Sequence, residues 1–145
     1  FGLVAVGGTY FLHNGHISWE VMLPAISCGL FSVGVLNVNN IRDIESDLVA
    51  GKRSIPVRVG RRRAVIYHWI LLTFAFISSI LFVYLKWVSI WQLMFLLCMP
   101  MFFQNGIGVM KRHEPVLLDP LLKQLAISTL LFVMLFGIGS LIAMN

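Results

Sequence analysis

The chain has 145 residues, of which 59% are hydrophobic and only 12% are charged. A soluble domain has about 25% charged residues on average, so this composition excludes an ordinary soluble domain and indicates an integral membrane protein. The net charge is +5, but the basic residues lie in short connections between apolar segments, which argues against a nucleic-acid partner.

Five apolar segments follow one another along the chain. The first, residues 1–12, is shorter than the ~20 residues that a membrane-spanning helix needs, and it has neither the charged start nor the cleavage site of a signal peptide. We therefore expect the N-terminal part to be missing, so that the chain begins inside a membrane helix. The other four segments are long enough to cross a bilayer: residues 19–40, 64–85, 88–110 and 121–144. The pattern predicts an all-α, multi-span bundle of transmembrane helices, with residues 1–145 in a single integral-membrane domain.

The connections between these segments alternate in basic charge. Residues 42–63 contain seven Lys or Arg, the connection before the last segment adds three when Lys123 is counted, and the connection between these two has Lys86 alone. Basic connections stay on the cytoplasmic side, so we expect a multi-pass protein of the cell inner (plasma) membrane with residues 42–63 in the cytoplasm. This rule alone accounts for five of the basic residues: Arg61, Arg62, Arg63, Lys111 and Arg112.

Two pairs of residues inside the spans have plain structural interpretations. Cys28 and Cys98 stand alone, without the spacing of a disulfide framework or a metal site, and are expected to pack among apolar side chains. Gly137 and Gly139 in the last span are expected to allow close contact between helices.

Residues 37–60, NVNNIRDIESDLVAGKRSIPVRVG, carry the pattern from which a function can be inferred. Three of the chain's six acidic residues, Asp43, Glu45 and Asp47, lie here and are followed directly by basic residues. Carboxylates at the end of a membrane helix are costly and mark functional sites. Their combination with clustered cations suggests a site that holds a metal ion together with a polyanion.

A helix that continues through this stretch places Asn40, Asp43 and Asp47 on one face, because they are three and four residues apart. Asp43 and Asp47 are then ~6 Å apart along the helix axis. Two carboxylates at this spacing can hold Mg²⁺, which proteins bind through one or two carboxylates plus substrate phosphates, and Asn40 can add an amide ligand. Glu45 points off this face and is expected to be exposed.

The residues after the carboxylates supply positive charge. Gly51 is expected to end the helix in a turn, after which Lys52 and Arg53 return toward the carboxylates and Arg58 adds a further cation. A solvated helix end and a basic loop that serves only topology would each show some of these residue types. Their combination in one short run at a membrane boundary favours a diphosphate site, in which metal ions and charge-assisted hydrogen bonds share the negative charge.

The string Asp43-x-x-x-Asp47-x-x-x-Gly51-Lys52 resembles the second aspartate-rich motif of the UbiA superfamily of membrane prenyltransferases. The longer sequence NNIRDIESDLVAGKRSIPVRVG is most similar to the branch of that family that acts on 1,4-dihydroxy-2-naphthoate in menaquinone biosynthesis. The resemblance implies a fold of nine transmembrane helices with two such motifs, of which this chain shows one motif and about the last five helices. The other metal-binding half is expected before Phe1, so that this chain alone should be inactive.

The resemblance implies a Mg²⁺-dependent transfer of a polyprenyl group from polyprenyl diphosphate to 1,4-dihydroxy-2-naphthoate, with loss of CO₂ and diphosphate, to give demethylmenaquinone. It implies that Asp43 and Asp47 bind Mg²⁺ and that Lys52, the third catalytic residue, contacts the diphosphate. The other implied substrate-binding residues are Asn40, Arg42, Arg53 and Arg58. Arg42 is expected to hold either the carboxylate of the acceptor or a neighbouring aspartate.

Tyr67, His68 and Trp69 follow the basic connection at the start of the next span. Each is expected to anchor its helix at the membrane interface. The alternative is that one of them faces the reaction chamber, where an aromatic face would stabilise a cation.

Two other functions remain open. One is that of a related UbiA enzyme with another aromatic acceptor, such as 4-hydroxybenzoate. The other, from a different class, is that of a cation-binding transporter fragment, because polar groups inside a membrane also mark ion paths. An accessory membrane subunit would leave the aspartate-rich string without a purpose.

Overall fold

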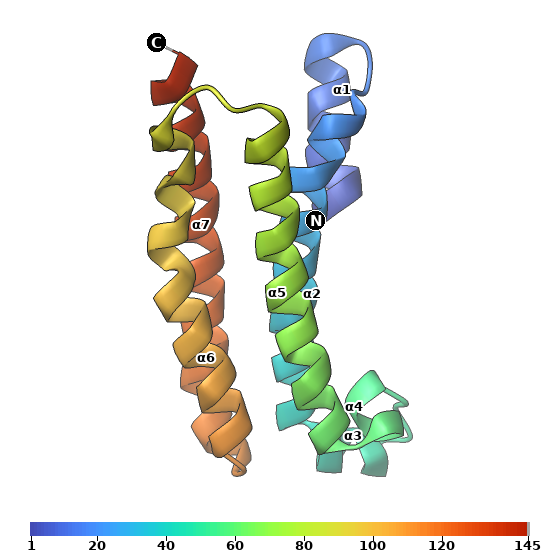
Figure 1. Ribbon diagram of the computed structural model, residues 1–145. Coiled ribbons are helices and arrows are strands. Elements are labelled where there is room, and N and C mark those ends of the chain that lie inside the picture. The colour runs from blue at the N-terminus through green and yellow to red at the C-terminus, as the bar shows by residue number, and fades with distance from the viewer. Residues whose placement is uncertain (145) are drawn as a thin grey trace.

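The computed structural model describes residues 1–144, in which every regular element is a helix (Figure 1). Four stretches are long and apolar enough to cross a membrane: Trp19–Arg42, Arg61–Leu85, Ile90–Lys111 and Pro115–Met144. These are the four crossings that the hydrophobic pattern predicts, and the all-α, multi-span class is confirmed.

The spans pack as two pairs that run side by side (Figure 1). In one pair, α2 (Met22–Arg42) lies along α5 (Arg61–Leu85). In the other, α7 (Asp119–Met144) lies along a span that begins as a 3-10 helix, η3 (Ile90–Cys98), and continues as α6 (Met99–Lys111). Because α2 also packs on α7, the two pairs form one bundle.

The first apolar segment forms two short helices that fold back on α2. A π-helical stretch, Gly2–Gly7, runs into α1 (Gly8–Asn14), and a 3-10 turn, Trp19–Val21, leads into α2. Gly2 approaches α2 so closely that a Cβ added to it would lie 2.5 Å from the carbonyl oxygen of Ala25.

Four phenylalanine rings, one from each span, form the centre of the bundle. The ring of Phe31 on α2 lies 5.4 Å from that of Phe76 on α5, 4.4 Å from that of Phe102 on α6 and 4.8 Å from that of Phe132 on α7, measured between centroids. Lipid is as apolar as these side chains, so close van der Waals and ring contacts hold membrane helices together. This cluster therefore fixes the register of all four spans.

The small residues of the spans have different environments. Cys98 is fully buried in the core and Cys28 is half-buried, and both are free thiols, as expected. A Cβ on Gly139 would collide with the carbonyl oxygen of Trp91, so the predicted close helix contact is confirmed there. The same prediction is wrong for Gly137, where no described residue lies within 4 Å of an added Cβ.

The basic connections gather at one end of the bundle. The short helices α3 (Ile44–Val49) and α4 (Ile55–Val59), which follow α2, lie at the same end as the connection from α6 to α7 (Figure 1). The connection from α5 to η3, which contains Lys86, lies at the opposite end together with α1. The alternation of charge predicted this grouping.

Candidate functional site

The helix that leads into the aspartate-rich segment is interrupted at Asp43. α2 ends at Arg42, α3 begins at Ile44, and Asp43 between them has φ −95° and ψ 13°. The prediction of one continuous helix through Asp47 is therefore wrong at this residue. Asp43 and Asp47 are nevertheless one helical turn apart. The backbone N–H of Asp43 donates to the carbonyl of Asn39 (3.0 Å), and the backbone N–H of Asp47 donates to the carbonyl of Asp43 (2.8 Å). Aspartate is a weak helix former because its carboxylate competes for nearby donors.

Arg42 and Asn39 are the donors that take up the Asp43 carboxylate. Arg42 donates from Nε to Oδ1 of Asp43 (2.7 Å) and from Nη2 to Oδ2 (3.0 Å), and Asn39 Nδ2 donates to the same Oδ2 (3.1 Å). The paired bonds of a guanidinium on a carboxylate are among the stronger contacts in proteins. The Arg42 side chain holds the pKa of Asp43 below its ordinary value, so this group is ionised at neutral pH.

The third guanidinium nitrogen of Arg42, Nη1, contacts a different span, α7. This nitrogen donates to Oδ1 of Asp119, the first residue of α7, over 2.7 Å. Arg42, Asp43 and Asp119 line an open cleft between the motif and the connection before α7. Of the two roles that the sequence left open for Arg42, the structure shows the contact with a neighbouring aspartate.

Asp47 lies deeper than Asp43 and has a different partner. Its side chain is 10% exposed, and Lys52 Nζ donates to Oδ1 over 3.1 Å. Gly51, with φ 71°, ends α3: its N–H donates to the carbonyl of Leu48 (3.2 Å), and the N–H of Lys52 donates to the carbonyl of Asp47 (2.8 Å). This pair of bonds is a Schellman motif, which requires a left-handed residue that glycine adopts without strain. The predicted helix end at Gly51 and the return of Lys52 toward the carboxylate are both confirmed.

Several buried oxygens in this segment lack a hydrogen-bond partner among the described residues. They are Oδ1 of Asn37, Oδ1 of Asn40, Oδ2 of Asp47 and Oγ of Ser54. Asn37 is anchored through its other amide atom, since Nδ2 donates to the carbonyl of Ala64 on α5 (3.0 Å). A buried acceptor without a donor costs about 1–3 kcal/mol, so these oxygens call for a cation or a donor. Carboxylate and amide oxygens are the ligands that Mg²⁺ accepts.

The fit to a metal ion is partial. An ionised carboxylate has about four lone-pair positions, and Asp43 uses three of them for its bonds to Arg42 and Asn39. Asp43 and Asp47 point to separate partners, Arg42 and Lys52. Within residues 1–144, no group of three or more His, Cys, Asp or Glu side chains is placed to hold a metal ion. The described residues therefore supply part of a cation site.

The remaining cations of the motif are free to meet an anion. Arg53 and Arg58 are exposed, and neither takes part in an ion pair within the described part of the chain. The predicted return toward the carboxylates is therefore confirmed for Lys52 and not for Arg53. Glu45 is exposed, as expected. The arrangement combines oxygen acceptors for a divalent cation with guanidinium and ammonium donors for a polyanion.

His68 is the polar residue whose setting differs most from the sequence-based expectation. It is fully buried inside the bundle, so it neither anchors α5 at the interface nor reaches an open chamber. Its Nε2 pairs with Oδ1 of Asn105 on α6 (3.2 Å), and Asn105 Nδ2 donates to the carbonyl of Leu121 on α7 (2.8 Å). The only signal in the sequence was a polar residue inside each of two apolar spans.

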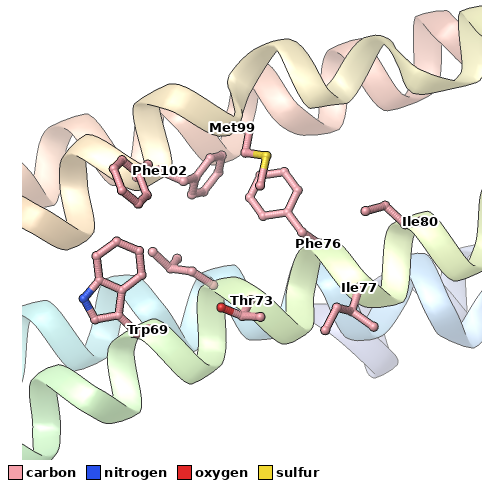
Figure 2. A pocket seen from close by; sticks show the side chains of 9 residues that line it. Trp69, Thr73, Phe76, Ile77, Ile80, Met99 and Phe102 are labelled. Carbon is pink, nitrogen blue, oxygen red and sulfur yellow. The ribbon is translucent and has the colours of Figure 1, made fainter.

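Trp69, in contrast, lines a cavity. An apolar space of about 180 Å³ lies between α5 and α6, and Figure 2 shows side chains from both helices around it. Trp69, Thr73 and Phe76 border it from α5, and Met99 and Phe102 from α6. Of the three aromatic residues singled out in the sequence, Trp69 is the one that faces such a space.

Comparisons with known proteins agree with the motif. The model of the UbiA prenyltransferase family matches residues 1–129. The chain is 41% identical, over 98% of its length, to a protein of Haemophilus influenzae named 1,4-dihydroxy-2-naphthoate octaprenyltransferase, and 36% identical, over 96%, to a protein of the same name from Escherichia coli. A 2-carboxy-1,4-naphthoquinone phytyltransferase of Synechocystis is 31% identical over 43% of the chain and 20% of that protein.

The chain spans about half the length of the curated relatives that it matches most fully. It covers 46% of the Haemophilus influenzae protein and 45% of the Escherichia coli protein. No solved structure matches the chain.

Proposed function

The chain belongs to the UbiA prenyltransferase family, and from this we propose that it forms part of an enzyme that moves a polyprenyl group from polyprenyl diphosphate to 1,4-dihydroxy-2-naphthoate. The ring loses CO₂, diphosphate departs, and the product is demethylmenaquinol, the hydroquinone form of demethylmenaquinone. The observation that carries the proposal is that proteins named for octaprenyl transfer to this acceptor match 98% and 96% of the chain, a coverage that includes the aspartate-rich segment.

The buried oxygens support a role in binding Mg²⁺. Asp47 and Asn40 each have an unpaired oxygen, and Asp43 has one lone-pair position left after its bonds to Arg42 and Asn39. We assign the metal to Asp43 and Asp47, with Asn40 as an amide ligand beside them. When bound, Mg²⁺ supplies positive charge that stabilises the departing diphosphate.

The cations of the segment divide into two roles. Lys52 has three N–H donors and gives one to Asp47, which leaves two for a diphosphate, and the exposed Arg53 and Arg58 can add to them. Arg42 makes contacts with protein groups through Nε, Nη1 and Nη2. It therefore positions Asp43 and is not assigned to the acceptor carboxylate.

We place the motif end of the bundle on the cytoplasmic side of the inner membrane. Ten of the eleven Lys and Arg residues belong to that end, and Lys86 belongs to the other. Cytoplasmic connections carry such an excess. A polyprenyl tail partitions into hydrocarbon, which explains why the enzyme is embedded in the bilayer.

This chain supplies one of the two metal-binding halves of a single membrane domain. It has one aspartate-rich string, and within the described residues no complete metal-binding group. We therefore propose that the chain alone is inactive and that a second acidic motif on other helices completes the site.

A chimera tests these points together. The part of the Escherichia coli relative that the chain does not match is placed before Phe1, and the chimera is purified next to the chain alone. Each is supplied with octaprenyl diphosphate, Mg²⁺ and either 1,4-dihydroxy-2-naphthoate or 4-hydroxybenzoate, and the products are identified by mass spectrometry. We expect prenylation of the naphthoate by the chimera only. A folded chimera that prenylates 4-hydroxybenzoate and not the naphthoate would overturn the acceptor, and turnover by the chain alone would overturn the two-half proposal.

The transporter alternative gains no support from the structure. An ion path needs polar groups along the spans. The buried pair His68 and Asn105 is bonded across α5 and α6 through Nε2 of His68, and Nδ1 of His68 has no partner among the described residues. Four of the five unpaired buried oxygens of the described residues lie instead between residues 37 and 54, at the motif end of the bundle, and the fifth is Oγ of Ser89 before η3.

A further inference from the structure

A groove between α5 and α6 lies at the motif end of the bundle but contains none of the motif residues. Its lining residues are Arg61, Arg62, Val65, Ile66, Met110 and His113. The groove thus combines Arg61 and Arg62 from the first turn of α5, and His113 from the connection after α6, with apolar side chains one turn further into the membrane. It is independent of the proposed transfer reaction.

The polar end of the groove carries only positive charge. Its polar lining residues are Arg61, Arg62 and His113, and no Asp or Glu is among the lining residues. Within the described part of the chain, neither Arg62 nor His113 takes part in an ion pair. The first turn of α5 has no side-chain cap, so its free N–H groups add the positive end of the helix dipole. An anion is the complement of this surface.

The Arg61 side chain is held in place on one side of the groove by hydrogen bonds to α6. Its Nη2 donates to the carbonyl oxygens of Val109 (2.9 Å) and Arg112 at the end of α6. These bonds use orphan carbonyls of a helix C-terminus and tie α6 to the start of α5. Arg62, the next residue, is exposed and keeps its guanidinium free for a ligand.

The other end of the groove is apolar and leads toward the bilayer. Ile66 and Met110 are 54% and 49% exposed on neighbouring spans. One face of α5 carries, at helical spacing, residues 62, 66, 69, 73, 77 and 80. The last four of these residues border the cavity between α5 and α6 (Figure 2). The groove is therefore positively charged at the end that contains Arg62 and apolar from Ile66 onward into the membrane.

We propose that this groove binds an anionic phospholipid, with the phosphate at Arg62 and His113 and an acyl chain along Ile66 and Met110. Basic pockets between spans on the cytoplasmic side suit anionic headgroups. A prenyl diphosphate has a similar shape, but its higher charge calls for a metal ion, and no Asp or Glu lines the groove. A phosphodiester with one negative charge needs only the cations and donors that are present.

Two adjacent arginines give a matched test. The full 145-residue chain is purified in neutral detergent and titrated with dioleoylphosphatidylglycerol or dioleoylphosphatidylcholine, and bound lipid is counted by native mass spectrometry. We expect one phosphatidylglycerol to bind at least about tenfold more tightly than phosphatidylcholine. Arg62→Gln should weaken it about fivefold or more. Arg63→Gln removes the same charge from a residue outside the groove and should change it less than about twofold.

The acyl chain is tested separately. Ile66→Asn should weaken phosphatidylglycerol binding, whereas Ile70→Asn, at a similarly exposed position on α5 that does not line the groove, should not. Circular dichroism of each variant verifies that the chain is folded.

Three results would overturn the proposal. Equal losses in Arg62→Gln and Arg63→Gln would show a diffuse attraction to anionic lipid without a site. Equal binding of the two phospholipids would show that the groove does not recognise the headgroup charge. Displacement of phosphatidylglycerol by farnesyl diphosphate with Mg²⁺ would assign the groove to the prenyl donor.

Discussion

Arg42 and Asp119 form an ion pair that joins the end of α2 to the start of α7, with 2.7 Å between Nη1 and Oδ1. The two residues are 77 positions apart in the sequence. Because the same guanidinium holds both carboxylate oxygens of Asp43, the last span helps to set the position of a proposed metal ligand.

Substitution of Asp119 tests this positioning role. Asp119→Asn removes the charge that anchors Arg42, so we expect kcat/KM of the chimera to fall several-fold, by about 1 kcal/mol of transition-state stabilisation. Stability should change little, because the Asp119 side chain is 56% exposed. Arg42→Lys should cost more, since one ammonium cannot replace the planar fork. Glu114→Gln on the same connection is the control, and an equal effect of the two acidic substitutions would contradict the role of Asp119.

The two glycines of α7 give a matched pair for packing. Gly139→Ala forces a methyl group against the backbone of Trp91, and overpacking of this kind costs about 1–3 kcal/mol. Gly137→Ala meets no described atom within 4 Å and should leave stability unchanged or raise it by up to about 1 kcal/mol. Unfolding by SDS titration measures both, and similar values for the two variants would show that the contact at Gly139 is not formed.

The buried pair His68 and Asn105 should contribute to stability. Asn105→Leu leaves the His68 ring and the Leu121 carbonyl without this partner, which we expect to cost about 1–2 kcal/mol of unfolding free energy. Gln104→Leu, at an exposed position next to it, is the control. The same SDS titration applies, and a variant Asn105→Leu as stable as the unmodified chain would remove the proposed contribution.

The crossings could be predicted from the sequence because a bilayer imposes a strong length requirement on apolar helices. The predicted segment 19–40 corresponds to the observed Trp19–Arg42, and 88–110 corresponds to Ile90–Lys111. The 3-10 geometry of Ile90–Cys98 and the interruption at Asp43 were not predicted. Both are local backbone details, and the average hydrophobicity of a span carries no information about them.

The site could be predicted only as far as its contacts are local. Asp47, Gly51 and Lys52 lie within two helical turns, so spacing and residue type were sufficient to relate them. The contacts of Arg42 with Asp119 and of His68 with Asn105 join different spans, and they depend on a helix register that one sequence does not specify. Of the partners of Asp43, Arg42 was foreseen as one of two alternatives for that arginine, whereas Asn39 was missed, because spacing on a helix shows which side chains share a face and not which donors they bind.

Lys52 should act on the prenyl donor and not on the acceptor. Lys52→Gln removes a charged donor next to Asp47, and a hydrogen bond to a charged group is worth about 1.5–3 kcal/mol. We expect KM of the chimera for octaprenyl diphosphate to rise about tenfold or more, with little change in KM for the naphthoate. Lys111→Gln, which removes one charge from the same end of the bundle, is the control. An equal rise in both KM values would count against a diphosphate contact.

The central claim is that the Asp47 carboxylate takes part in a Mg²⁺ site that promotes diphosphate release. Its most direct test is the Mg²⁺ dependence of diphosphate release by the chimera, compared between Asp47→Asn and Glu45→Gln, which each remove one negative charge from α3. The account predicts that Asp47→Asn lowers the rate at saturating substrate by at least about 100-fold and raises the Mg²⁺ requirement, while Glu45→Gln behaves like the unmodified chimera. Wild-type rate and Mg²⁺ dependence in Asp47→Asn would contradict it.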